Sequence, residues 1–159
     1  MEKKKRQEYA ARITQANRTQ LLVIMYEMIQ EELKQALWEY DQEEMELFDG
    51  ALKNAGKFLG ELMGTLDYKY SVSYELMSIY KFVNKVIIEA RLRGQTTNID
   101  RCIQIIENLK VGYEEIVSED QSGPVMANVQ KLYAGLTYGK GALNEISVNV
   151  NDSARGLYA

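Results

Sequence analysis

Apolar residues recur every three or four positions along four stretches of the chain, a spacing that places them on one face of an α-helix. These stretches cover residues 22–40, 45–66, 72–90 and 99–117. The connection between the first two is very short, which forces these helices to run antiparallel. The pattern therefore predicts an all-α fold, an antiparallel up-down four-helix bundle.

Polar residues and glycines mark the expected ends of these helices. Asp41 with Glu44, and Thr97 with Asp100, have the spacing of capping boxes, which satisfy free N–H groups at a helix start. Gly94 follows a last turn that contains arginines, a combination typical of a helix C-terminus. These signals predict helices that begin at Asp41 and Thr97 and one that ends at Gly94.

The C-terminal part has a different pattern. A proline followed by an amphipathic stripe over residues 124–136 predicts an additional C-terminal helix, and residues 147–159 are polar enough for an extended or mobile tail. We expect residues 1–118 to form the bundle, with 1–16 as a flexible N-terminal segment or cap. Residues 119–159 would then be a helical extension and tail.

Residue types that are missing exclude several classes of function. The 159 residues contain no histidine and one cysteine, Cys102. Zinc sites of the usual kind, Ser-His-Asp and Cys-His nucleophile systems and Glu-x-x-His di-iron sites all need residues that the chain lacks. We therefore expect no enzyme activity, no metal and no cofactor. Cys102 is interpreted as a small core residue, and a lone cysteine fits a reducing cytosol.

Charge and hydropathy argue against two further classes of partner, nucleic acids and membranes. A net charge of −4 argues against nucleic-acid binding, and the basic run at residues 3–6 is typical of a solvated, disordered end. No stretch approaches the ~20 apolar residues of a membrane span, so we expect a soluble protein without membrane insertion. Glu43, Glu44 and Glu46 could be read as catalytic carboxylates, but they are best explained as a solvated face.

The first and third predicted helices carry more apolar residues than the roughly three per heptad that a bundle core needs. The surplus consists mainly of adaptable methionines and tyrosines: Met25, Met28, Tyr74, Met77 and Tyr80. Leu21, Ile24 and Met28 also form a second row beside the main stripe of the first helix. Such a surface suits the binding of a partner helix, although the C-terminal helix or a second copy of the chain, as a homodimer, could cover it instead.

Three glycines, Gly56, Gly60 and Gly64, recur every four residues along the second predicted helix. Each should cost about 1 kcal/mol relative to alanine in a helix interior. They could mark a docking surface where another backbone comes close, or tight packing within the bundle, and the second interpretation is favoured.

Several segments resemble the FliS family of flagellar secretion chaperones. Tyr9 and the stretch Ile13-Thr14-Gln15-Ala16-Asn17-Arg18-Thr19-Gln20-Leu21-Leu22-Val23-Ile24-Met25-Tyr26-Glu27 are similar to the family's N-terminal signature. Residues 51–67, 76–83 and 88–90 resemble its later motifs, in the same order. Together these matches span residues 9–117. The chain departs from the family at Ala16-Asn17-Arg18, where the family has Ala-Ser-Pro.

The resemblance implies a cytoplasmic chaperone that binds the C-terminal segment of flagellin, prevents its premature polymerisation and assists its secretion. It also implies that other flagellar regulators could be partners. The alternative is a helical scaffold or a regulator-binding bundle, whose apolar face is covered by the chain itself or by a second copy. We expect Tyr26 to be a core residue whose hydroxyl reaches the edge. The expected partner contacts, with the first two residues acting as a lid, are Tyr9, Ile13, Leu21, Ile24, Met25, Met28, Tyr74, Met77 and Tyr80.

Overall fold

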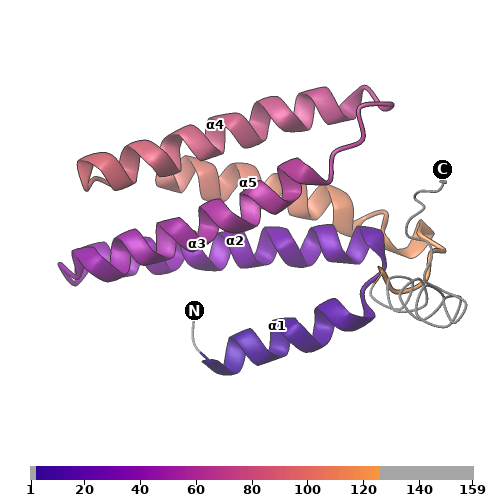
Figure 1. Cartoon of the computed structure of the whole chain (residues 1–159), viewed down its shortest axis with the longest axis horizontal. Helices are drawn as coiled ribbons and strands as arrows, with labels where there is room; N and C mark the ends of the chain where they lie inside the picture. Colours follow the sequence, from indigo (N-terminus) through magenta and orange to yellow (C-terminus); the bar gives the residue numbers. More distant parts are fainter. Residues whose placement is uncertain (1–2, 126–159) are drawn as a thin grey trace, which may run out of the picture.

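The computed structural model describes residues 3–125, and these residues form an all-helical fold, as the periodicity predicts (Figure 1). The predicted C-terminal helix (residues 124–136), apart from its first two residues, and the predicted tail (147–159) lie outside the described residues. No strand occurs within residues 3–125. The elements in chain order are α1 (Lys3–Gln15), α2 (Arg18–Asp41), α3 (Met45–Gly64), α4 (Val72–Arg93), α5 (Ile99–Glu114) and the 3₁₀ turn η1 (Val117–Glu119).

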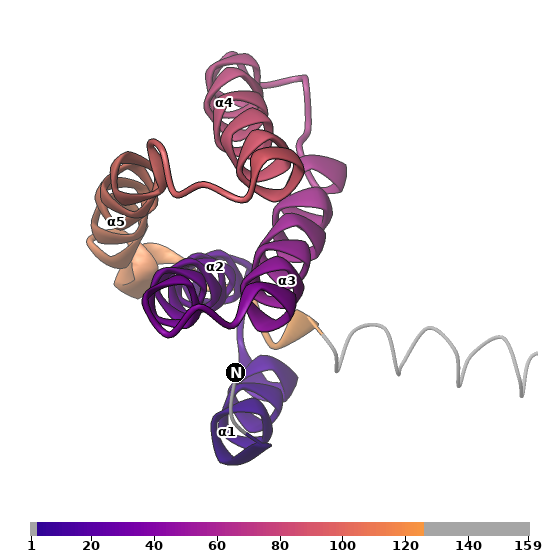
Figure 2. The ribbon, with the colours of Figure 1, turned by 90° about the vertical axis from the view of Figure 1, so that its left-hand side faces the viewer.

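Helices α2 to α5 form the predicted four-helix bundle. Helix α2 packs against α3 and α5, and α4 packs against the same two helices. Consequently α2 and α4 occupy opposite corners of the bundle, as the end-on view shows (Figure 2). Helix α1 lies outside the bundle, along α2. Among the described helices, none is both long and apolar enough to cross a membrane.

The bundle interior is built from the periodic stripes of all four helices. A helix that presents one apolar face buries that face against its neighbours, and here the four faces meet in one continuous core. Cys102 is fully buried in it, as expected of a small core residue. The largest fully buried apolar side chains of this core are Tyr26, Tyr80, Phe48, Ile29, Leu33, Leu52, Leu59, Leu62, Ile87, Ile99 and Ile106.

A pair of tyrosines spans the core between the two corner helices α2 and α4. The hydroxyl oxygens of Tyr26 and Tyr80 lie 2.6 Å apart in a buried hydrogen bond. The ring of Tyr113 from α5 lies beside Tyr26, with centroids 5.8 Å apart. Burial raises the pKa of Tyr80 to about 12 and raises that of Tyr26 further. The prediction that the Tyr26 hydroxyl reaches the edge of the bundle is therefore wrong, because Tyr80 satisfies it inside.

Two of the predicted helix starts are also wrong. Helix α2 continues through Asp41, and α3 begins after Glu44, whose side chain makes no capping hydrogen bond. Helix α5 begins after Asn98, again without a side-chain cap. Three-residue spacing alone does not distinguish a capping pair from polar residues that happen to lie near a helix end. The predicted end at Gly94 is confirmed, since its φ of 62° is the left-handed conformation that glycine tolerates.

The N-terminal segment differs from the expectation of a flexible cap, because residues 3–15 form helix α1. No proline or glycine interrupts this segment, and most of its residues are good helix formers. Tyr9 and Ile13 are four residues apart and share one face, which packs against Ile24 and Met28 of α2. The basic run at residues 3–6 is typical of a solvated end, and two apolar residues one helical turn apart are too few to predict a helix.

The glycine ladder of α3 does not have one common explanation. A Cβ atom built on Gly56 would meet Ile87 of α4 at 3.8 Å, which is ordinary contact within the bundle. Cβ atoms on Gly60 and Gly64 would meet nothing within 4 Å. The favoured interpretation, tight packing within the bundle, is therefore wrong for these two glycines as far as residues 3–125 are concerned.

Candidate helix-binding face

A second apolar cluster lies outside the main core, between α1, α2 and α3. Its buried members are Ala16 at the end of α1 and Ile24 and Met28 of α2, which are 3%, 3% and 8% exposed. The partly buried side chains around them are Tyr9, Ile13, Leu21 and Phe58. We call the surface formed by Leu21, Ile24, Met28 and Phe58 the α1-covered face. It includes the second apolar row of α2 that the sequence revealed.

Helix α1 covers this face with two side chains. Tyr9 and Ile13 are both half-buried, while the other residues of α1 are exposed. Burial raises the pKa of Tyr9, and the negative charges of Glu27 and Glu31 add to this rise. The structure thus brings together five of the predicted contact residues: Tyr9, Ile13, Leu21, Ile24 and Met28.

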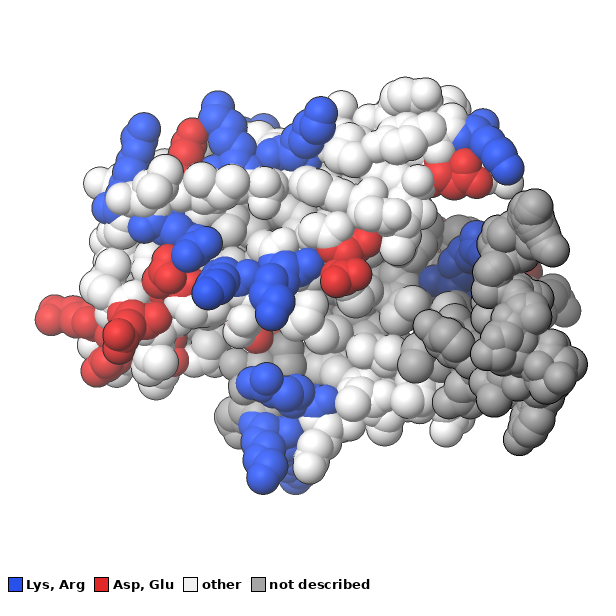
Figure 3. Space-filling view, in the orientation of Figure 1, with Lys and Arg blue, Asp and Glu red and all other residues white. Residues whose placement is uncertain are grey.

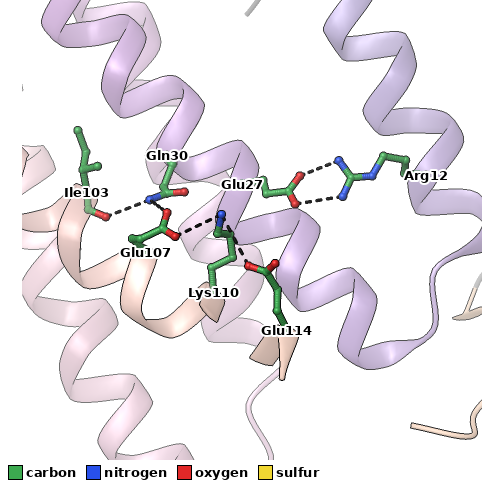
Figure 4. Close-up of polar contacts among 7 residues, drawn as sticks. All are labelled: Arg12, Glu27, Gln30, Ile103, Glu107, Lys110 and Glu114. Carbon is green, nitrogen blue, oxygen red and sulfur yellow. Dashed lines mark hydrogen bonds and ion pairs between the residues drawn. The ribbon is translucent and has the colours of Figure 1, made fainter. Parts of the chain in front are cut away.

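Two ion pairs hold α1 along its outer edge. The guanidinium of Arg12 donates to both carboxylate oxygens of Glu27, at 2.6 and 3.1 Å (Figure 4). This hydrogen bond raises the pKa of Arg12. Lys5 pairs with Glu31 one turn further along α2. All four side chains remain in contact with solvent, and such pairs typically contribute about 0–1 kcal/mol each.

The connection between α1 and α2 consists of Ala16 and Asn17, and Asn17 also caps the start of α2. Asn17 and Gln20 form a capping box, in which Asn17 Oδ1 accepts from the Gln20 N–H at 2.8 Å. Gln20 Oε1 in turn accepts from the Asn17 N–H at 3.0 Å. This box stands at the position where the FliS resemblance predicts Ala-Ser-Pro, so a different pair of residues fixes the start of α2.

Opposite the α1 side, α2 is tied to α5 by a polar network. The side-chain amide of Gln30 donates to the carbonyl of Ile103 at 3.1 Å and to Glu107 at 2.9 Å (Figure 4). Gln30 lowers the pKa of Glu107, and Lys110 adds to this effect. These contacts place the two sides of α2 in different surroundings: one is fixed within the bundle, and the other carries α1.

Two exposed apolar side chains of α2 and α3 lie beyond the reach of α1. Figure 1 shows that the N-terminus of α1 does not reach the C-terminal part of α2, where the chain turns into α3. Trp38 lies seven residues after Glu31, two helical turns further along the same side of α2, and is 56% exposed. Leu47 of α3, near the same turn, is 55% exposed. Neither residue belongs to the predicted site.

The remaining predicted contact residues lie elsewhere. Met25 is partly buried against the main core, and Tyr80 is only 1% exposed in its interior. Tyr74 is 61% exposed on α4, and its ring lies tilted against that of Tyr68, with centroids 4.9 Å apart. Met77, one turn further along α4, is half-buried. Because α4 and α2 stand at opposite corners, the structure does not bring these α4 residues to the α1-covered face.

Phe58 is the member of the α1-covered face that the sequence analysis missed. It lies next to the heptad stripe of α3, one position before the buried Leu59. An aromatic residue beside a clean heptad stripe is the signal that could have indicated a second packing surface on this helix.

Charged side chains gather over several parts of the bundle. Figure 3 shows basic side chains over α4 and over the start of α1, with acidic side chains at the end where α2 meets α3. Within residues 3–125, no three histidine, cysteine or carboxylate side chains come close enough together to hold a metal ion. The chemistry that the face offers is the burial of apolar side chains.

A small helical bundle with a second apolar face under a short outer helix has the kind of surface on which other proteins bind amphipathic helices. A family model described as flagellar protein FliS matches residues 1–121. The chain therefore belongs to the FliS family, a family of flagellar export chaperones rather than enzymes, and the resemblance in the sequence is confirmed. A search of curated proteins finds no match.

Proposed function

We propose that the protein binds the C-terminal helical segment of flagellin in the bacterial cytosol, and keeps it from polymerising until it is secreted. Membership of the FliS family supports a role in flagellar export. The observation that carries the proposal is the second apolar cluster: Ile24 and Met28 are buried beneath α1, in a cluster separate from the core that stabilises the bundle. In this proposal the flagellin segment takes the place of α1.

Helix α1 is suited to being displaced. It has 13 residues, and helices of this length are only marginally stable in water on their own. Its apolar contacts come from two half-buried side chains, and its ion pairs are exposed. A longer amphipathic helix can bury the same face with more apolar side chains, so the exchange replaces a weak contact with a stronger one.

The exposed side chains of Trp38 and Leu47 support a longer path for the partner. A flagellin helix longer than α1 would continue from Met28 towards these two exposed residues. Tyr74 and Met77 remain candidates for a second contact with a more distant part of the same segment, because Tyr74 is exposed. We leave Tyr80 out of the proposed contacts, since it is buried and hydrogen-bonded to Tyr26.

Aspartate substitutions test the proposal. Ile24→Asp combined with Met77→Asp should leave the far-ultraviolet circular dichroism helical and weaken flagellin binding by at least about tenfold, since a buried carboxylate opposes apolar contact. The matched control is Leu92→Asp, at a side chain that is 81% exposed on the outer side of α4.

The two single variants, titrated calorimetrically with a flagellin C-terminal peptide, separate the two areas. Loss of affinity in Ile24→Asp alone would assign binding to the α1-covered face, and loss in Met77→Asp alone would assign it to α4. Unchanged affinity in the double variant would contradict the proposal.

A further inference from the structure

The chain that follows α5 returns to the short connection between α1 and α2. Asp120 Oδ2 accepts hydrogen bonds from the backbone N–H of Thr19 at 3.0 Å and from its hydroxyl at 2.7 Å. The two residues are 101 positions apart in the sequence. This is a long-range polar contact at the start of α2, where helices present free N–H groups.

Three further hydrogen bonds fix the same place. The backbone N–H of Val125 donates to the carbonyl of Ala16 at 3.0 Å, and the side-chain amide of Asn17 donates to the carbonyl of Asp120 at 3.4 Å. On the other side, the N–H of Ser122 donates to Asp120 Oδ1 at 2.9 Å, which orients the carboxylate. We call the contacts that Asp120 and Val125 make with residues 16–19 the clasp.

The clasp is not needed to start helix α2. Asn17 and Gln20 already cap that end with their reciprocal hydrogen bonds. What the clasp fixes instead is the connection of Ala16 and Asn17, and any movement of α1 away from α2 must rotate the backbone there. Ala16 is itself buried in the cluster that α1 covers, so the clasp and the α1-covered face share a residue.

We propose that Asp120 is a positioning residue that holds α1 closed over Ile24 and Met28. The inference rests on the proposed function in so far as α1 is displaced by the partner. The clasp stabilises the closed position of α1 through contacts that residues outside α1 make. By reciprocity, a ligand that displaces α1 loosens the clasp, and with it the start of the C-terminal extension.

Hydrogen exchange on the full chain tests the inference. Asp120→Ala should accelerate exchange of the α1 amides by about threefold or more, because it raises the population in which α1 is detached. Exchange in α4 and α5 should stay unchanged. Thr19→Val removes the hydroxyl donor but keeps the backbone donor, so it should have a smaller effect in the same helix. Asp120→Asn, which keeps an acceptor oxygen, should restore part of the protection.

The matched control is Asp67→Ala. Asp67 Oδ1 accepts from the N–H of Lys69 at 3.0 Å, a similar local contact in the α3–α4 connection that does not touch the clasp. It should leave α1 exchange as in the parent protein. Unchanged α1 exchange in Asp120→Ala would overturn the inference, and so would equal acceleration in every helix, which would show only a general loss of stability.

Binding of a flagellin C-terminal peptide to the same variants separates the inference from the proposed function. If the peptide replaces α1, Asp120→Ala should bind it several-fold more tightly, because less of the protein is in the closed form. Faster α1 exchange with unchanged peptide affinity would support the clasp and contradict the assignment of the peptide to the α1-covered face.

Discussion

Helix α2 contributes to two apolar clusters, and they differ in what covers them. On its inner side, Tyr26 and Leu33 are fully buried by α3, α4 and α5 together. On its outer side, Ile24 and Met28 are almost as deeply buried, but beneath α1, with Leu21 of α2 and Phe58 of α3 beside them among the described residues. Two side chains of one helix can therefore be almost equally buried, one by three helices of the bundle and the other mainly by a single short helix.

The difference follows from the stability of each cover. Helices α3 to α5 support one another around the core, so none can leave without exposing the interior of the whole bundle. Helix α1 packs chiefly on α2, and its removal exposes only the outer cluster. Local opening of such an element can occur at a fraction of the free energy of global unfolding.

The largest expected effect is on the inner cluster. Leu33→Ala should lower the free energy of unfolding by about 2–5 kcal/mol, because it leaves a cavity in a fully packed core. Ile13→Ala removes a half-buried side chain of α1 and should change global unfolding far less, while accelerating hydrogen exchange in α1. Urea denaturation and exchange measure the two effects. Equal losses of global stability would show that α1 unfolds together with the bundle.

The tyrosine pair provides a test of intermediate size. Tyr26→Phe should cost about 1–3 kcal/mol, because the hydroxyl of Tyr80 is then buried without its partner. The double variant Tyr26→Phe with Tyr80→Phe removes both hydroxyls and should cost less than the sum of the single variants. Denaturation of all four proteins gives the coupling energy. Additive costs would mean that the hydrogen bond does not couple α2 to α4.

The smallest expected effect concerns a glycine of α3. Gly60→Ala should raise the free energy of unfolding by about 0.5–1 kcal/mol, because it improves helix propensity where an added Cβ meets nothing within 4 Å. Because the gain belongs to the bundle, exchange in α1 should not change. Gly94→Ala is the contrasting variant: its φ is +62° and its Cβ would lie 3.2 Å from Met45 Cε, so it should destabilise. A loss of stability in Gly60→Ala would contradict this interpretation of the open face.

The sequence predicts the bundle well because each of its helices repeats one signal many times. The stripes that contain Leu33, Leu52, Val83 and Ile106 all face the core, and each stripe spans several turns. Single-residue signals are weaker. Gly94 ends its helix as predicted, because the left-handed conformation has few alternatives to glycine. The spacing of Asp41 and Glu44 fails as a start signal, because Asp41 is still the last residue of α2 and Glu44 directly precedes α3.

The candidate site is less predictable because it depends on which helices become neighbours. The second apolar row of α2 is visible in the sequence, but its cover is a short helix whose apolar face consists of little more than Tyr9 and Ile13. Periodicity cannot show that α2 and α4 lie at opposite corners. The sequence therefore predicts one contact surface for Met77 and Ile24, which the bundle separates. The contact between Asp120 and Thr19 has no local sequence signal at all.

The position of Trp38 has a practical consequence. It is the only tryptophan of the chain, and it stands exposed on the side of α2 where α1 no longer reaches. Its fluorescence therefore reports from a single known place, without any label. A guest helix that extends past the N-terminus of α1 would shield the indole from water and shift its emission to shorter wavelength, whereas a guest no longer than α1 would leave the spectrum unchanged.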